Sequence, residues 1–225
     1  MLYKKKASAR FVLSIVFVIL FFVSGSSAER INKFDLQEPL DDFIKLLIKR
    51  RSVRSFSNAP LTTQQLSYLL YAADARTPNG NRTAPSARAV YPIDIYVFVR
   101  NVTGLEKGIY YYNPRYHYLQ TIKKGDFSAQ LSAACRNQTS ISQAAAVLSM
   151  FYVISRMKPR FGEQGVHYAA LEAGHISQNF LLAAAKLNLG AVPVGGFENE
   201  KVLKILEFSP QKKVTLYLNP VGNIR

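Results

Sequence analysis

Residues 39–99 change from helical to strand periodicity. Residues 39–51 gather their apolar side chains on one face, which predicts an amphipathic helix. Residues 62–75 repeat this pattern, and Thr62 and Gln65 at their start have the spacing of a capping box. Residues 93–99 instead alternate aliphatic side chains with polar or aromatic ones, as a strand does.

The rest of the chain continues to mix strands and helices. Residues 108–112 and 116–122 predict a hairpin, and the continuous apolar run over 145–154 predicts a buried central strand. Residues 167–189 form the longest helix candidate, which we expect Gly190 to end. The remaining predicted elements are short: helices over 126–136 and 199–207 and a last strand over 214–218.

This order of elements favours a layered α/β sandwich, because strands and helices interleave without strict alternation. A polar connection over residues 76–92 separates the second helix from the first strand. Connections of this length in a compact domain often bind ligands, so we expect a binding role here.

The N-terminus is typical of an export signal. Four basic residues precede an apolar stretch from Phe11 to Val23, and small residues end at Ala28. The stretch is shorter than the ~20 residues of a membrane-spanning helix. Residues 1–28 therefore predict a cleaved signal peptide, with an uncleaved anchor as the alternative. We expect a single domain over 29–225, located in the periplasm, outside the cell, or anchored outside the cytoplasm.

Composition and charge narrow the classes of partner. The chain is 48% apolar and has a mean hydropathy of -0.00, as globular proteins do. Without residues 1–28, 25 basic and 14 acidic residues leave a net charge of +11. This charge favours an anionic ligand or surface. Export and the lack of a nucleic-acid-binding signature argue against nucleic acid. Cys135 is the only cysteine, so we expect a small buried residue and no intramolecular disulfide.

Three segments have the composition of a site for an anion or a flat ligand. Residues 50–54 combine arginines with Ser52, and arginine and hydroxyl donors match phosphate oxygens. Residues 82–92 combine small residues with two arginines, and residues 193–197 contain a Gly-Gly pair that exposes backbone N–H groups. Taken singly, each segment is better interpreted as an ordinary turn, loop or solvated helix end.

Together, and in this order, the segments resemble the FMN-dependent nitroreductase family, and within it the branch of SagB-type dehydrogenases. The segments that carry the resemblance are Arg82 to Ala87 followed by Tyr91 to Val97, Gly108 to Tyr112 with His117 to Leu119, Tyr168 to His175, and Gly195 to Phe197. The resemblance covers about residues 43–222. It implies an α+β fold, namely a three-layer α/β/α sandwich with a mixed central sheet, in an intertwined homodimer.

The resemblance also implies flavin-binding residues. Arg50, Ser52 and Arg54, with Arg51 beside them, would contact FMN, and the phosphate is the expected target of at least two of them. Arg225 is a further candidate for the phosphate, with a frayed terminus as the alternative.

Other segments would contact the isoalloxazine ring. Pro85, Ser86 and Ala87 would line it from the partner subunit. Gly195, with Gly196 beside it, would place a backbone N–H near N5, where hydride arrives. Either Arg54 or Arg88 would stabilise the anionic reduced ring, and the sequence does not decide between them.

Two departures from the branch leave the substrate open. Arg88 replaces a glycine in the loop. Arg160 and Phe161 stand where azoline-oxidising members carry Lys-Tyr, and neither side chain can act as the base. The catalytic acid or base therefore stays unassigned. Glu172 and His175 have Glu-x-x-His spacing, but a single copy is too little for a metal site, and none is expected.

Three functions follow as hypotheses. The first is an FMN-dependent oxidoreductase that moves two electrons by a ping-pong mechanism, with NAD(P)H as one potential donor. Export argues against this donor, because nicotinamides are cytoplasmic. The second is an azoline-to-azole dehydrogenase of a peptide-modifying system. The third is a non-catalytic basic domain that binds an anionic surface.

Overall fold

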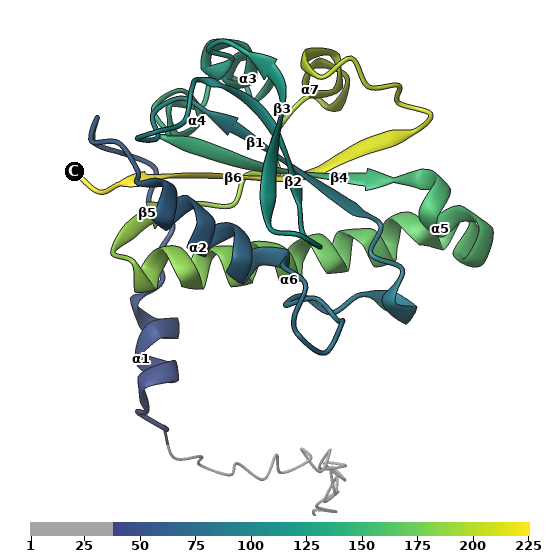
Figure 1. The fold of residues 1–225 in the computed structure, drawn as a ribbon, viewed down its shortest axis with the longest axis horizontal. Coiled ribbons are helices and arrows are strands. Elements are labelled where there is room, and N and C mark those ends of the chain that lie inside the picture. The colour runs from purple at the N-terminus through teal and green to yellow at the C-terminus, as the bar shows by residue number, and fades with distance from the viewer. Residues whose placement is uncertain (1–37) are drawn as a thin grey trace, which may run out of the picture. The chain divides into compact units, whose positions relative to one another are not determined.

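Six strands form one sheet in the order β3-β2-β1-β4-β6-β5 (Figure 1). The strands are β1 (Ile93–Val99), β2 (Gly108–Asn113), β3 (Tyr118–Lys124), β4 (Ala146–Val153), β5 (Leu189–Ala191) and β6 (Lys213–Asn223). The computed structural model describes residues 38–225, so the predicted signal segment over 1–28 lies outside the described residues. Within residues 38–225, no helix is both long and apolar enough to cross a membrane.

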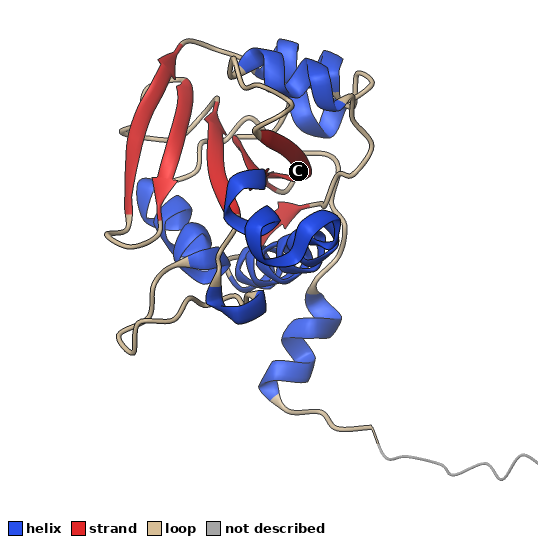
Figure 2. Ribbon diagram, turned by 90° about the vertical axis from the view of Figure 1, so that its right-hand side faces the viewer, coloured by secondary structure: helices blue, strands red, loops and turns tan. Residues whose placement is uncertain are grey.

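Helices cover both faces of the sheet. They are α1 (Asp42–Lys49), α2 (Thr63–Asp74), α3 (Ser128–Ala134), α4 (Thr139–Ser142), α5 (Ile154–Phe161), α6 (Gly165–Lys186) and α7 (Asn199–Ile205), with short 3₁₀ turns at Ala87–Ala89 and Gly162–Gln164. The helices α2 and α6 lie on one face, and α3, α4 and α7 lie on the other (Figures 1 and 2). The predicted three-layer α/β/α arrangement is confirmed.

The expectation of a mixed sheet is wrong in one respect. Every pairing between the six strands is antiparallel. Parallel pairing among the described residues is confined to two isolated bridges, Ser52 with Ala191 and Leu61 with Val102. The bridge at Ser52 matters below, because it fixes a candidate binding segment to the edge of the sheet.

The two central strands supply side chains to both hydrophobic cores. Along β1, Ile95 and Val97 pack towards α2 and α6, and Phe98 packs towards the other layer of helices. β4 divides in the same way, with Met150 in the first core and Phe151 in the second. This alternation is the period-2 geometry of a strand that is buried on both faces.

Local signals set several boundaries as expected. Thr62 accepts a hydrogen bond from Gln65 N, and Gln65 Oε1 accepts one from Thr62 N, so the predicted capping box is confirmed. Gly190, however, does not end the long helix. α6 ends at Lys186, Asn188 takes a left-handed φ of 57°, and Gly190 belongs to β5.

Candidate functional site

The cationic segment Arg50–Arg54 lies against the edge strand β5. Ser52 bridges Ala191, and Val53 N donates to Ala191 O at 3.0 Å. Gly190 permits this close approach, because a Cβ there would lie 2.7 Å from Val53 Cγ1. The sequence prediction did not foresee this role of Gly190, since the glycine's neighbours come from a distant segment.

The arginines of this segment have no acidic partner in the part of the chain that the structure describes. Arg51 and Arg54 are exposed and Arg50 is half-buried. Among residues 38–225, none of the three forms an ion pair or a side-chain hydrogen bond. Unpaired guanidinium groups beside an exposed hydroxyl have the donor chemistry that a phosphate requires.

Arg225 reaches the same region from the C-terminus, where two hydrogen bonds hold its side chain. Its Nε donates to Phe56 O at 3.0 Å, and Nη2 donates to Gln143 Oε1 at 3.4 Å. Ile224 also pairs with Phe56. The guanidinium group of Arg225 is therefore held at Phe56, two residues after Arg54 in the sequence.

The Gly195-Gly196 turn continues from β5. Val194 pairs with Leu218 of β6, and Gln138 Nε2 donates to Gly196 O at 2.9 Å. Both glycines are exposed, and a Cβ at Gly195 would make only an ordinary contact with Tyr217 at 3.6 Å. Neither glycine has a positive φ. The chain itself therefore leaves room for side chains at both positions, and the bare backbone is open to a ligand.

These elements share one edge of the sheet. Ala191, which pairs with Ser52, and Gly195 are four residues apart, a separation that spans at most about 13 Å in extended backbone. A mononucleotide has this scale when its phosphate lies at one end and its ring at the other. The cations and the exposed glycine amides therefore lie along one edge, within the reach of a single ligand of that size.

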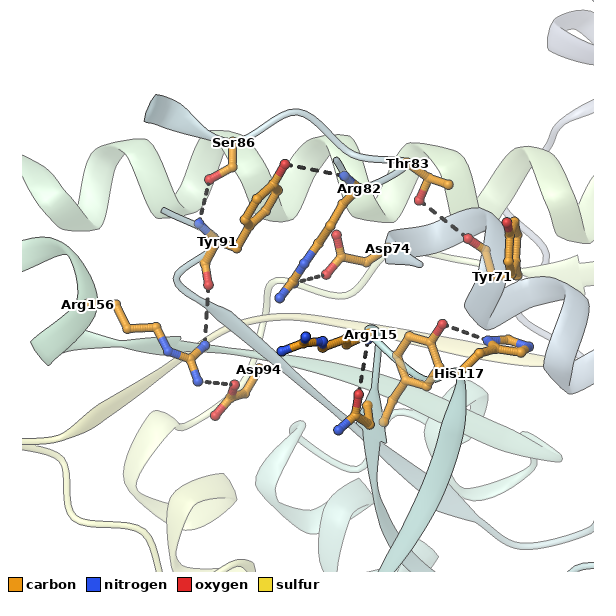
Figure 3. Close-up of polar contacts among 12 residues, drawn as sticks. Tyr71, Asp74, Arg82, Thr83, Ser86, Tyr91, Asp94, Arg115, His117 and Arg156 are labelled. Atoms are coloured by element: carbon orange, nitrogen blue, oxygen red, sulfur yellow. Dashed lines mark hydrogen bonds and ion pairs between the residues drawn. The ribbon is translucent and has the colours of Figure 1, made fainter. Parts of the chain in front are cut away.

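The loop over residues 82–91 lies elsewhere, over α2 and α6, and a polar network holds it. Arg82 pairs with the buried Asp74 at 2.5 Å and stacks over the Tyr91 ring at 4.6 Å (Figure 3). Tyr91 N donates to Ser86 Oγ at 2.9 Å, and Tyr91 O accepts from Arg156 at 3.3 Å. This part of the polar connection is thus well fixed by side-chain contacts.

Arg88, which stands where the resemblance implies a glycine, has a left-handed backbone conformation. Its φ is 51°, and Ala89 and Tyr91 are also left-handed, with φ of 52° and 50°. Non-glycine residues adopt this region at an energetic cost, and such strain concentrates at functional sites. Arg88 occupies a backbone position that suits glycine.

The structure does not bring this loop to the cationic segment. Within residues 38–225, no hydrogen bond or ion pair joins Pro85, Ser86, Ala87 or Arg88 to Arg50–Arg54 or to the glycine turn. The choice between Arg54 and Arg88 as the cation near the ring stays open. The prediction that the loop contacts the flavin from a partner subunit stays a prediction.

Two buried carboxyl groups lie beneath the loop. Asp74 is 1% exposed and Glu172 is 2% exposed. Burial raises the pKa of Asp74 to about 7, although Arg82 opposes the shift. Burial also raises the pKa of Glu172 to about 7, and Asp74 adds to the increase while Ser86, Arg82 and Arg156 lower it. Sequence reasoning assigned neither group a role in the site, although both acids interrupt apolar helix faces.

Other predicted residues lie apart from these groups. His175 is exposed, whereas Glu172 is buried, so the Glu-x-x-His pair shares no site. Arg160 and Phe161 end α5, where the Phe161 ring packs on Tyr168 with centroids 4.9 Å apart. Cys135 is fully buried, as predicted.

A groove of about 740 Å³ lies over α2 and is lined by Ser67, Tyr68, Tyr71 and His117 among others. His117 bridges Ser67 and Tyr112 at 2.7 and 2.8 Å. The lining of this groove includes none of the residues that were predicted to contact the flavin. We therefore locate the candidate site at the β5 edge, where the cations and the exposed amides lie.

Two named proteins are similar to this chain in sequence. A protein of Methanocaldococcus jannaschii described as a nitroreductase is 40% identical over 192 residues, which cover 84% of this chain and 96% of that protein. The trifolitoxin-processing protein TfxB of Rhizobium leguminosarum bv. trifolii is 29% identical over 157 residues, which cover 57% of this chain and 38% of TfxB.

Solved structures share the fold. A protein of Anabaena variabilis described as a nitroreductase superposes with a TM-score of 0.71 at 29% identity, over 81% of this chain and 38% of that one. A Desulfovibrio desulfuricans protein solved in complex with FMN gives a TM-score of 0.61 at 19% identity, over 83% of this chain and 88% of that one. The profile of the nitroreductase family matches residues 47–223. This chain belongs to the nitroreductase family.

Proposed function

We propose that this protein is an FMN-dependent oxidoreductase that transfers two electrons by a ping-pong mechanism. The main support is the arrangement along β5, where unpaired arginines, the anchored Arg225 and the exposed glycine turn lie on one edge of the sheet. The complex of the Desulfovibrio desulfuricans protein with FMN agrees with this choice of cofactor.

Each end of the site has a defined task. Arg50, Ser52, Arg54 and Arg225 bind the phosphate through charge-assisted hydrogen bonds. The backbone N–H groups at Gly195 and Gly196 orient the ring, because no side chain covers them. When bound, FMN supplies a ring that accepts hydride at N5 and returns two electrons to a second substrate. NADH or NADPH is the candidate first substrate.

A second copy of the chain completes the site. Pro85, Ser86 and Ala87 are separated from the cations within one chain, so a partner would contribute them. Exposed apolar side chains on α1 and α6 agree with a homodimer: Phe43 is 59% exposed, Leu171 is 50% exposed and Val166 is 44% exposed. If the flavin-loaded protein sediments as a monomer, the shared site is wrong.

The test begins with the colour of the purified full-length protein and with titration of FMN. Replacing Arg50 and Arg54 together by alanine should reduce FMN affinity at least about tenfold, since each charged hydrogen bond contributes about 1.5–3 kcal/mol. The matched control replaces Lys107 and Lys124, which pair with Asp126 and Glu106 elsewhere. Anaerobic titration with NADH and NADPH then identifies the donor.

If the purified protein is colourless and does not bind FMN, the proposal is wrong. Salt-dependent binding of that protein to anionic vesicles would instead favour the basic surface-binding domain. Export, which we retain as a proposal, would favour an electron donor other than a nicotinamide.

The azoline dehydrogenase of the SagB-type branch remains a second candidate because of the similarity to TfxB, whose name assigns it to trifolitoxin processing. Arg160 and Phe161 oppose it, because neither can accept a proton from an azoline ring. Oxidation of a thiazoline-containing peptide by the flavin-loaded protein would support this function, and the lack of it would leave a reductase of nitro compounds or quinones.

A further inference from the structure

The groove over α2 has the size of a ligand site, although the proposed function makes no use of it. Its volume is about 740 Å³, within the roughly 300–1,000 Å³ of small-molecule pockets. A smaller hollow of about 120 Å³ adjoins it between α2 and the hairpin of β2 and β3, and Thr63, Ser67 and His117 line both. The groove and the hollow together form a site with a wide entrance and a deeper end.

The two ends of this site differ in their side chains. Tyr68 and Tyr71 line the entrance and are 42% and 43% exposed. The deeper end is lined mainly by aliphatic side chains, those of Leu66, Leu70, Leu105 and Leu119. Among residues 38–225, neither lining includes an Asp, Glu, Lys or Arg, although the whole chain has a net charge of +15. The site therefore suits a neutral ligand better than an anion.

A chain of hydrogen bonds leads from the core to this site. Tyr112 is 1% exposed, and its hydroxyl oxygen lies 2.8 Å from His117 Nδ1. A buried hydroxyl needs an acceptor for its proton, and among the described residues only His117 is within reach, so Tyr112 donates to Nδ1. Burial lowers the pKa of His117 from its ordinary value of 6.5, so at pH 7 the ring is neutral and carries its one proton on Nε2.

The hydrogen-bond chain ends at Ser67. Nε2 of His117 and Ser67 Oγ are 2.7 Å apart, so Nε2 donates and Oγ accepts. The hydroxyl proton of Ser67 then has no acceptor within residues 38–225, and the residue is exposed on the wall of the groove. Because linked hydrogen bonds polarise one another, this hydroxyl is a strengthened donor. A ligand that uses it needs an acceptor atom, such as a carbonyl oxygen.

The turn that carries His117 is fixed by the protein itself. Asn113 Oδ1 accepts hydrogen bonds from Arg115 N and Tyr116 N at 3.0 and 3.1 Å. His117 has a left-handed φ of 52°, a conformation that costs energy and is concentrated at functional sites. The Tyr71 ring meets the His117 ring edge to face, with centroids 5.3 Å apart (Figure 3). The aromatic wall and the donor chain are thus arranged before a ligand binds.

We propose that this groove is a second ligand site, which binds a small, neutral, planar aromatic molecule that carries a carbonyl oxygen. The aromatic ring lies against Tyr68 and Tyr71, its apolar end enters the leucine-lined hollow, and the carbonyl oxygen accepts the hydrogen bond from Ser67. A second copy of the chain laid across α2 would cover the tyrosines but would leave the hollow and the Ser67 donor unused. The depth of the site and its donor therefore favour a small molecule.

Equilibrium dialysis of the full-length protein near pH 7 tests this with two probes of similar shape. The first is 2-acetylnaphthalene, which has the carbonyl group, and the second is 2-ethylnaphthalene, which lacks it. We expect the wild type to bind both. In Ser67→Ala, the affinity for the ketone relative to the hydrocarbon should fall about three- to tenfold, the effect of one neutral hydrogen bond. The ratio cancels the difference in hydrophobicity between the probes.

Tyr71→Ala tests the aromatic wall and should weaken both probes about fivefold or more, because it removes ring contact from each. The matched control is Tyr116→Ala, which removes a 66% exposed tyrosine of the same hairpin turn that lines neither hollow. It should leave both affinities unchanged. All variants keep residues 1–37, so binding of a probe to that segment would not differ between them.

Four results would each overturn the inference: no binding of either probe to the wild type, an unchanged ratio in Ser67→Ala, equal effects of Tyr71→Ala and Tyr116→Ala, or a dimer that Tyr71→Ala converts to a monomer in sedimentation. The last result would make the groove an interface between copies. If Tyr71→Ala does not fold, the ratio in Ser67→Ala decides, since alanine is favourable at an exposed helix position. The expected pattern in a protein that never binds FMN would leave this inference standing and remove the proposed function.

Discussion

Arg225 donates a hydrogen bond from Nε to the carbonyl oxygen of Phe56, 3.0 Å away, and so ties the last residue of the chain to the segment that follows Arg54. The C-terminal cation is therefore held beside the cationic segment by a hydrogen bond from its side chain to the backbone. Its removal should affect the proposed phosphate site more than it affects the fold.

We predict that Arg225→Ala weakens FMN binding about tenfold or more while lowering the free energy of unfolding by only about 1 kcal/mol, the value of an ordinary hydrogen bond. Isothermal titration and urea denaturation measure the two effects. Arg225→Lys should recover part of the affinity, because the charge returns without the planar donor pair. Unchanged affinity in Arg225→Ala would remove this residue from the site.

Two glycines near the site should respond in opposite ways. A Cβ at Gly190 would meet Val53 Cγ1 at 2.7 Å, so Gly190→Ala should destabilise the fold by about 1–3 kcal/mol. A Cβ at Gly195 has room, with Tyr217 at 3.6 Å, so Gly195→Ala should fold normally and lose flavin affinity. Thermal unfolding and FMN titration on the same samples separate these outcomes. Equal stability losses would contradict the assignment.

Arg88→Gly should stabilise the protein by up to about 1 kcal/mol, since glycine adopts the φ of 51° without the steric cost. Arg88→Ala removes the same charge but keeps the Cβ, so it should not reproduce the gain. The midpoint of urea unfolding distinguishes the two variants. A gain in both would attribute the effect to charge.

Glu172 should make stability depend on pH. A carboxyl group with a pKa of about 7 when folded and 4.5 when exposed binds more protons in the folded state, so stability is present at low pH and is lost as pH rises from about 4.5 to about 7. Relative to wild type, Glu172→Gln should be about 3 kcal/mol more stable at pH 8 and similar at pH 4. A difference independent of pH would indicate a packing effect.

Cys135 should be inert in the folded protein. Burial raises the pKa of its thiol to about 12, so at pH 8 almost none is the reactive thiolate. A thiol reagent should react slowly in buffer and quickly in denaturant. Fast reaction under native conditions would show that the second core opens readily.

Sequence reasoning succeeded where the signal is local. The capping pair Thr62 and Gln65 and the buried strand at 146–153 depend on neighbours in the chain. It failed at Gly190, which looks like a helix end but serves the approach of Val53 from 137 positions away. Likewise, the loop over residues 82–91 is held by Asp74 of α2 and Asn179 of α6, and only the fold brings these two residues together.

Because β1 and β4 supply side chains to both cores, neither layer of helices can detach without exposing the strands that serve the other. The domain should therefore unfold in one cooperative transition, with no half-folded species that retains a working phosphate site. Cofactor loss and global unfolding would then be separable only by local events, such as the release of a loop or of the C-terminal arginine.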